Sequence, residues 1–177
     1  FESLASNLVA GDRNGVRDVF VRDLVLHSTV RASVTWNGVE PDRWSYYPAI
    51  SDDGRFVAFQ SLATNMVPDD HNGRDDIIVR DLVAGTTTRV SLSATGGDPE
   101  LDCYDASMSH DGRFVAFTSE ATNLVGADPN GSVADVYVKD LFSGAIARLD
   151  VGASASYRPS ISGDGHTLAF YRLAGTD

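Results

Sequence analysis

The 177 residues, 42% of them hydrophobic, are enough for one folded domain with a substantial core. A formal net charge of −11 argues against nucleic acids and anionic membranes as partners, and no apolar run is long enough for a membrane-spanning helix. The acidic residues are 21 aspartates and only 4 glutamates. Because aspartate favours turns and hard-metal sites whereas glutamate favours helices, this bias predicts a turn-rich chain and is compatible with bound calcium.

The first seven residues introduce an internal repeat. FESLASN at 1–7 recurs as FQSLATN at 59–65 and as FTSEATN at 117–123, so the spacing is 58 residues. A related FYRLA follows at 170–174. Three periods and a short overlap therefore fill the chain, and a period of this length is typical of repeat architectures such as propellers.

Short strand-like runs alternate with tight turns along the rest of the chain. The predicted strands are 19–23 and 30–34, then 48–51, 55–59, 77–81 and 87–91, then 106–109, 113–117, 136–140 and 147–151, and finally 159–162 and 166–170. Asp-Gly pairs at 53–54, 111–112 and 164–165 predict tight hairpins, since glycine adopts positive φ without strain.

Four antiparallel strands in each repeat indicate one blade of a β-propeller. We therefore predict an all-β propeller domain over residues 1–177, with three blades in each chain. Residues 47–92 and 105–151 are predicted to form two complete blades. The third blade is divided between 159–177 and 1–34.

The pattern Ser-x-Asp-Gly-Arg-Phe-Val-Ala-Phe, present at 51–59 and 109–117, precedes a strand that ends in Asp before a Gly turn. This combination resembles the TolB-like, WD40-like propeller repeats of bacterial proteins, and the resemblance covers essentially the whole chain. It implies the propeller fold and favours a periplasmic or extracellular location. It implies no particular activity, because propellers carry many. The repeats exceed the usual ~40–45 residues, and the additional residues lie in two loops that the strand order places on one face.

The first long loop has the pattern Asp-x-Asn-Gly, with a further aspartate two to four residues later. Calcium takes six to eight oxygen ligands, and side chains two residues apart in a tight turn can converge on one ion. The candidate calcium ligands are Asp12, Asn14, Asp18, Asp70, Asn72, Asp76, Asp128, Asn130 and Asp135. The same pattern also forms metal-free Asx-turns, and the distal glutamate of an EF-hand is missing, so both interpretations remain open.

The second long loop joins successive blades and is rich in aromatic residues. Trp36 and Trp44 occur in one copy alone, which favours contact with a ligand or partner. Tyr46, Tyr104 and Tyr157 recur at one blade position, which we expect near the mouth of the central channel. They are candidates for the same site, with packing between blades as the alternative.

Two further sets of residues recur in every repeat. Arg31, Arg89 and Arg148 fall in the outermost strand, where charge is expected to protect a sheet edge from aggregation. Asn7, Asn65 and Asn123 are expected to hydrogen-bond the local backbone.

The sequence contains no phosphate-binding Gly-rich loop, no Gly-x-Ser-x-Gly elbow and no His-Glu-x-x-His pattern, and we name no catalytic residue. The expected function is a non-enzymatic binding or scaffolding module for a protein or carbohydrate ligand, with calcium-stabilised loops on one face. The alternative is a hydrolase or lyase of the propeller type, or the propeller portion of one, acting on a carbohydrate or peptide. A hydrolase should gather mixed acidic, basic and aromatic groups in its channel, whereas a scaffold should show repeated small residues.

Three blades are too few to close a ring, since propellers typically have four to eight. Two copies would supply six blades if each C-terminal hairpin completed the partner's N-terminal blade. We therefore expect a homodimer. The alternative is that the sequence is a fragment of a longer chain.

Overall fold

The structure, a computed structural model, describes residues 1–126, 128–149 and 152–174. The described residues form thirteen β-strands, and no helix able to span a membrane is present among them. In chain order the strands are β1 (Glu2–Ser3), β2 (Asp18–Arg22), β3 (Thr29–Arg31), β4 (Ser45–Ile50), β5 (Phe56–Ser61), β6 (Asp76–Asp81), β7 (Thr86–Arg89), β8 (Cys103–Met108), β9 (Phe114–Ser119), β10 (Asp135–Asp140), β11 (Ile146–Arg148), β12 (Ser156–Ile161) and β13 (Leu168–Arg172).

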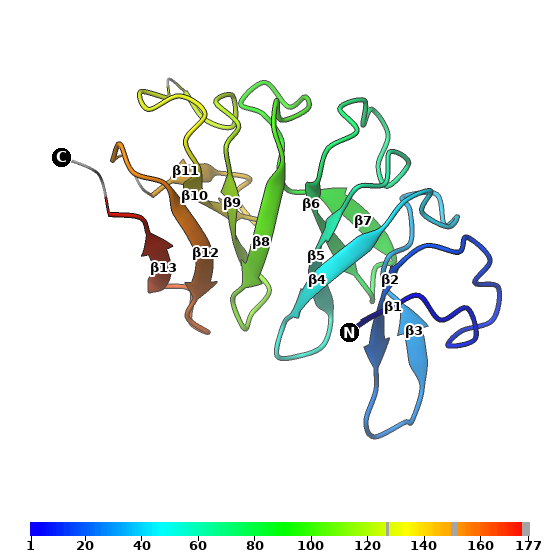
Figure 1. The fold of residues 1–177 in the computed structure, drawn as a ribbon. Helices are drawn as coiled ribbons and strands as arrows, with labels where there is room; N and C mark the ends of the chain where they lie inside the picture. The colour runs from blue at the N-terminus through cyan, green and yellow to red at the C-terminus, as the bar shows by residue number, and fades with distance from the viewer. Residues whose placement is uncertain (127, 150–151, 175–177) are drawn as a thin grey trace.

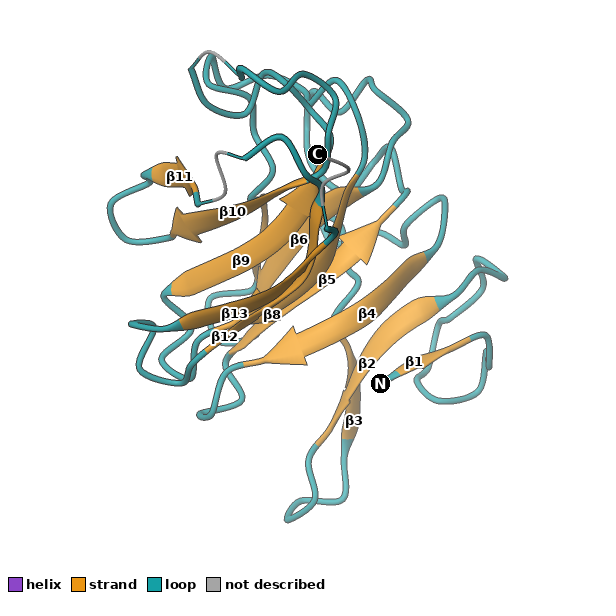
Figure 2. Ribbon diagram, turned by 60° about the vertical axis from the view of Figure 1, so that its left-hand side comes forward, coloured by secondary structure: helices purple, strands orange, loops and turns teal. Residues whose placement is uncertain are grey.

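These strands form two complete and two partial antiparallel sheets. The complete sheets are β4-β5-β6-β7 and β8-β9-β10-β11, each ordered as in the sequence. The partial sheets are β1-β2-β3 and β12-β13. Figure 1 shows the four sheets side by side as blades of an open fan, and Figure 2 shows the long loops gathered at one end of the strands. The all-β architecture of four-stranded blades is therefore confirmed.

The strand bounds differ from the sequence prediction at the blade edges. β4 and β8 begin at residues 45 and 103, before the predicted boundaries of 47 and 105. Each of these strands contains a shift in pairing register, and the pairing extends on both sides of it. Part of the predicted second blade, residues 150–151, and the last three residues of the predicted third blade, 175–177, lie outside the described residues.

The Ser-x-Asp-Gly turns are stabilised by their own side chains. In the first complete blade the Ser51 hydroxyl donates to Asp53 Oδ1 at 2.6 Å, and the Arg55 amide donates to the same oxygen at 2.9 Å. Gly112, in the equivalent turn of the next blade, has a φ of 70°, and a Cβ there would lie 2.4 Å from the Phe56 ring. Glycine is therefore required both for the turn and for the stacking of one blade on its predecessor.

The hydrophobic core lies between the sheets. One buried cluster joins the two complete blades and includes Val79, Val90, Met108, Val115 and Tyr137. A second joins the N-terminal sheet to the first complete blade. All but the first residue of β5 are buried, because both faces of this strand pack against neighbouring sheets.

Candidate functional site

Each Asp-x-Asn-Gly loop surrounds an arginine from the outermost strand of its own sheet. In the first complete blade, Arg89 Nη1 lies 3.5 Å from Asp70 Oδ1, 3.3 Å from Asp76 Oδ2 and 2.7 Å from Asp98 Oδ1. Burial raises the pKa of the Asp76 carboxyl to about 6, although hydrogen bonds from Ser91 and Arg89 favour the charged form. A guanidinium thus lies among the carboxylates that the loop pattern assigns to calcium.

The N-terminal copy has the same arrangement, with Arg31 near Asp12 (3.5 Å), Asp18 (3.5 Å) and Glu40 (2.8 Å). In the third copy Arg148 pairs with the two loop aspartates, Asp128 and Asp135 (3.2 Å for Asp135). The three arginine side chains are only 12%, 4% and 8% exposed. The expectation that they protect a sheet edge is therefore wrong, because they neutralise buried carboxylates instead. No group of three or more His, Cys, Asp or Glu side chains in the described parts of the chain is arranged to hold a metal ion. Calcium binding stays a prediction.

The asparagines proposed as calcium ligands bind the loop that joins two blades. The side-chain amide of Asn14 donates to the Pro41 carbonyl at 3.2 Å, and that of Asn72 donates to the Pro99 carbonyl at 3.2 Å. Asn130 donates to the Gly152 carbonyl at 2.9 Å in the same way. These side chains therefore fasten the two long loops of each repeat together.

A second asparagine strengthens the same connection. Asn65 donates to the Glu40 carbonyl at 3.0 Å and accepts a bond from the Asp42 amide at 3.1 Å. Asn123 repeats this pattern in the next blade. Both bonds reach the backbone of a separate loop, so the expectation of purely local bonds is wrong for these two residues.

The two long loops lie on one face, as the strand order predicts. The Trp36 amide donates to the Met66 carbonyl at 3.0 Å, and Met66 lies in the same β5–β6 loop as Asp70. Trp36 and Trp44 are 54% and 50% exposed. The Trp44 ring lies 5.6 Å from the Arg17 guanidinium and lines a cavity of about 390 Å³. Both tryptophans are accessible to a partner on this face.

The recurring tyrosines are held by acidic side chains. The Tyr46 hydroxyl donates to Asp75 Oδ1 at 2.5 Å, and the Tyr104 hydroxyl donates to Glu120 Oε1 at 2.9 Å. Burial, with these carboxylates, raises the pKa of both phenols. Tyr157 lines a cavity together with Tyr104. The hydroxyl groups of Tyr46 and Tyr104 thus have structural partners, and the assignment of these tyrosines to a ligand site stays a prediction.

The residue after each of these tyrosines has an unusual backbone. Tyr47, Asp105 and Arg158 have φ values of 52°, 57° and 53°. Each lies at the register shift of an innermost strand, β4, β8 or β12. A left-handed conformation costs a non-glycine residue about 1–2 kcal/mol, and such strain is concentrated at functional sites. We call these three the channel-mouth residues, after the central channel that the innermost strands line in a closed propeller ring.

The channel-mouth residues occupy one repeat position with three different side chains: aromatic, acidic and basic. They line one cavity of about 350 Å³, together with Pro48, Ala106 and Pro159. Asp105 and Arg158 also line an adjacent cavity of about 580 Å³ with Tyr104, Tyr157 and Tyr171. Within the described residues, neither the Asp105 nor the Arg158 side chain forms a hydrogen bond or ion pair. The sequence analysis did not identify this set, although variation at one position of an otherwise regular repeat indicates a functional residue.

No family model and no curated protein matches the chain. Among solved structures it is similar to TolB from Acinetobacter baumannii, with a TM-score of 0.56 and 21% identity over 91% of this chain and 33% of TolB. It is also similar to a TolB-like protein from Agrobacterium tumefaciens, with a TM-score of 0.56 and 18% identity over 92% of this chain and 53% of that protein. A third match is the tricorn protease, with a TM-score of 0.59 and 16% identity over 90% of this chain and 13% of the protease.

The chain has a TolB-like β-propeller fold. It spans less than two thirds of the length of each of these proteins. The TolB-like fold arranges β4, β8 and β12 side by side, as Figure 1 shows, and this brings the channel-mouth residues of three blades to one place.

Proposed function

We propose that the chain is a non-enzymatic binding module that holds its ligand at the channel mouth. The observation that carries this proposal is the variation at a single repeat position. Tyr47, Asp105 and Arg158 differ in chemistry, share a strained backbone and line one cavity. Residues kept only for blade packing would be expected to repeat, as the buried phenylalanines Phe59 and Phe117 do.

The chemistry of the cavities favours an extended polar ligand with an apolar side. The Arg158 guanidinium can pair with a carboxylate or donate hydrogen bonds to a carbonyl or hydroxyl oxygen. The Asp105 carboxylate can accept bonds from hydroxyl or amino groups. Three tyrosine rings beside them offer apolar surface for a sugar face or a side chain. A carbohydrate or a peptide segment meets these requirements.

The mixed character of the same groups favours a second candidate, a propeller-type hydrolase or lyase or the propeller portion of one. Such an enzyme would be expected to gather an acidic side chain, a cationic side chain and aromatic rings in its channel, and the two cavities contain all three kinds. In this case Asp105 would act as general acid or base, and Arg158 would stabilise negative charge.

Glycan and peptide arrays probed with the labelled chain test the proposal. The expected result is a set of ligands that the native chain retains and that Asp105→Ala and Arg158→Ala variants lose. The Asp52→Ala variant, changed at an exposed position in a tight turn, should bind like the native chain. Equal binding by all variants contradicts the proposed site. Cleavage of a retained ligand, detected by mass spectrometry and abolished by Asp105→Asn, would favour the enzyme instead.

A further inference from the structure

One cavity on the face of the long loops lies apart from the channel mouth. It has a volume of about 390 Å³ and is lined by Val16, Asp42, Arg43, Trp44 and Leu62. These residues come from the β1–β2 loop, from the loop that precedes β4 and from the residue that follows β5. None of them lines the two cavities at the channel mouth, so this Trp44 cavity is a separate site.

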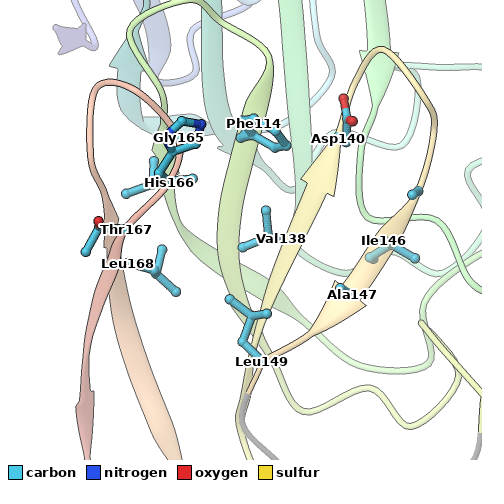
Figure 3. A pocket seen from close by; sticks show the side chains of 12 residues that line it. Phe114, Val138, Asp140, Ile146, Ala147, Leu149, Gly165, His166, Thr167 and Leu168 are labelled. Carbon is cyan, nitrogen blue, oxygen red and sulfur yellow. The ribbon is translucent and has the colours of Figure 1, made fainter.

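The position of the Trp44 cavity is open to solvent at a complete blade junction as well. Asp102 takes the place of Trp44 between the two complete blades, and its side chain is 39% exposed. The apolar groove in Figure 3 is different, because Leu149 lines it at 46% exposure while the equivalent Val90 is 1% exposed between the complete blades. The exposure of the Trp44 cavity is therefore a property of the junction itself.

The lining of this cavity is apolar where the next junction is charged. The apolar residues and their charged equivalents 58 residues later are Val16 and Arg74, Trp44 and Asp102, and Leu62 and Glu120. The fold therefore does not require apolar side chains at these positions. Trp44 is nevertheless 50% exposed. Exposed apolar surface, kept where the repeat tolerates charge, indicates a binding site.

Contacts within the chain fix the Trp44 ring before any ligand binds. The Trp44 carbonyl accepts a hydrogen bond from the Leu62 amide at 3.0 Å, and the Ser45 amide donates to the Arg17 carbonyl at 2.8 Å. The Arg17 guanidinium lies 5.6 Å from the centroid of the Trp44 ring, and Glu2 holds it in an ion pair at 3.0 Å. Because the ring is fixed, less conformational entropy is lost when a ligand binds.

Two side chains of opposite charge line the same cavity. The Asp42 carboxylate accepts bonds from the Thr64 amide at 2.9 Å and the Thr64 hydroxyl at 2.7 Å, one on each oxygen. Each oxygen keeps a second lone pair for a ligand. Arg43 forms no hydrogen bond or ion pair within the described residues, so its guanidinium is available as a donor.

We propose that the Trp44 cavity binds one pyranose ring of a neutral carbohydrate. A pyranose with mostly equatorial hydroxyl groups has an apolar C–H face that can stack on the indole ring. Its hydroxyl groups both donate and accept, so one ring can bond Asp42 and Arg43 together. An anionic ligand would meet Asp42 and a chain of net charge −11, and a cationic ligand would meet Arg43.

An apolar side chain of a peptide is the competing occupant of the cavity. It would cover the Trp44 ring but would offer no hydrogen-bond partner to Asp42 or Arg43. Dependence of binding on the Arg43 side chain therefore separates the two occupants.

Tryptophan fluorescence of a Trp36→Phe variant tests the proposal, because Trp44 is then the only tryptophan of the chain. The probes are cellotetraose, acetylated chitotetraose and mannotetraose at millimolar concentration. At least one of them should shift the Trp44 emission to shorter wavelength in a saturable way, because the stacked indole leaves water. Val16→Arg in the same background should abolish this shift. It introduces the residue that the next repeat has at this position, so folding should be preserved.

Two further variants examine the polar rim. Arg43→Ala should weaken binding roughly fivefold, because hydrogen bonds from a charged donor are lost. Arg74→Ala is the matched control, since it changes the equivalent of Val16 at the next junction, where Arg74 is 45% exposed. It should leave the affinity unchanged.

The absence of a saturable shift with all three sugars overturns the proposal, and so does an unchanged affinity in Val16→Arg or in Arg43→Ala. A shift caused by N-acetylleucinamide and by none of the sugars would assign the cavity to a peptide side chain instead. Asp105→Ala should lose the ligand of the channel mouth and retain this shift. The failure of either proposal therefore leaves the other standing.

Discussion

Arg89 donates a hydrogen bond to the Asp76 carboxylate at 3.3 Å, and both side chains are almost fully buried. Asp70 and Asp98 pair with the same guanidinium. The cluster of three carboxylates and one guanidinium therefore has a formal net charge of −2. Separate segments of the chain meet at this point: the β5–β6 loop with the start of β6, the end of β7, and the loop between blades. The cluster therefore fixes the long loops to the blade.

Replacing Arg89 by methionine should destabilise the chain by about 3–5 kcal/mol, since it leaves buried carboxylates without their counterion. Urea unfolding monitored by tryptophan fluorescence measures the change. Arg55→Met is the matched control, because its ion pair with Asp81 is partly exposed and should contribute no more than about 1 kcal/mol. Similar losses in the two variants would contradict a special role for the buried arginine.

The arginine clusters also define a test of calcium binding. If the loops bind calcium as the sequence predicts, millimolar calcium should raise the melting temperature of the native chain and EDTA should reverse the change, as for any native-state ligand. The rise should be larger in Arg89→Met, because the guanidinium no longer competes for the carboxylates. A melting temperature of the native chain that calcium and EDTA both leave unchanged would contradict calcium binding.

Asp76 should make stability depend on pH between about 4 and 6. Its pKa is raised from 3.8 to about 6, so the folded chain binds this proton more tightly than the unfolded chain. The contribution of Asp76 to the free energy of unfolding is thus largest below pH 4 and falls as pH rises to 6, by at most about 3 kcal/mol. Asp76→Asn should flatten this part of the profile. Asp53→Asn is the control, because the pKa of Asp53 is lowered and its contribution changes below pH 4.

Asn65→Ala should loosen the aromatic loop. It removes two hydrogen bonds to the backbone at Glu40 and Asp42, and about 1–2 kcal/mol of stability. Hydrogen exchange should accelerate at amides 36–44. Asn123→Ala makes the equivalent change one blade later and should accelerate exchange near 98–100 while leaving 36–44 unchanged. Identical exchange in the two variants would contradict a local role for each asparagine.

The regular parts of the fold were readable from sequence because they depend on local chemistry. The Asp-Gly turns need only a glycine with positive φ, and β5 needs only apolar residues on both faces. The common face of the long loops follows from strand order alone.

The parts that sequence reasoning missed depend on tertiary contacts. Arg89 forms an ion pair with Asp70, which lies 19 residues earlier in the sequence, and no motif near either residue predicts this pairing. No glycine marks the left-handed backbone at Asp105 and Arg158 in the sequence, because the pairing of the surrounding strands imposes this conformation on other residues. An arginine recurs in every repeat that has an acidic loop, but the sequence alone explains this recurrence equally well by protection of a sheet edge.

The most direct test of the account is the stability of glycine variants at the channel mouth. If Asp105 and Arg158 keep a strained backbone for binding, Asp105→Gly and Arg158→Gly should each raise the free energy of unfolding by about 0.5–1 kcal/mol. Relief of left-handed strain then exceeds the entropy that glycine adds to the unfolded chain. Alanine at the same positions retains the strain and should give no gain. A loss of stability in both glycine variants would show that these side chains serve the fold and would contradict the account.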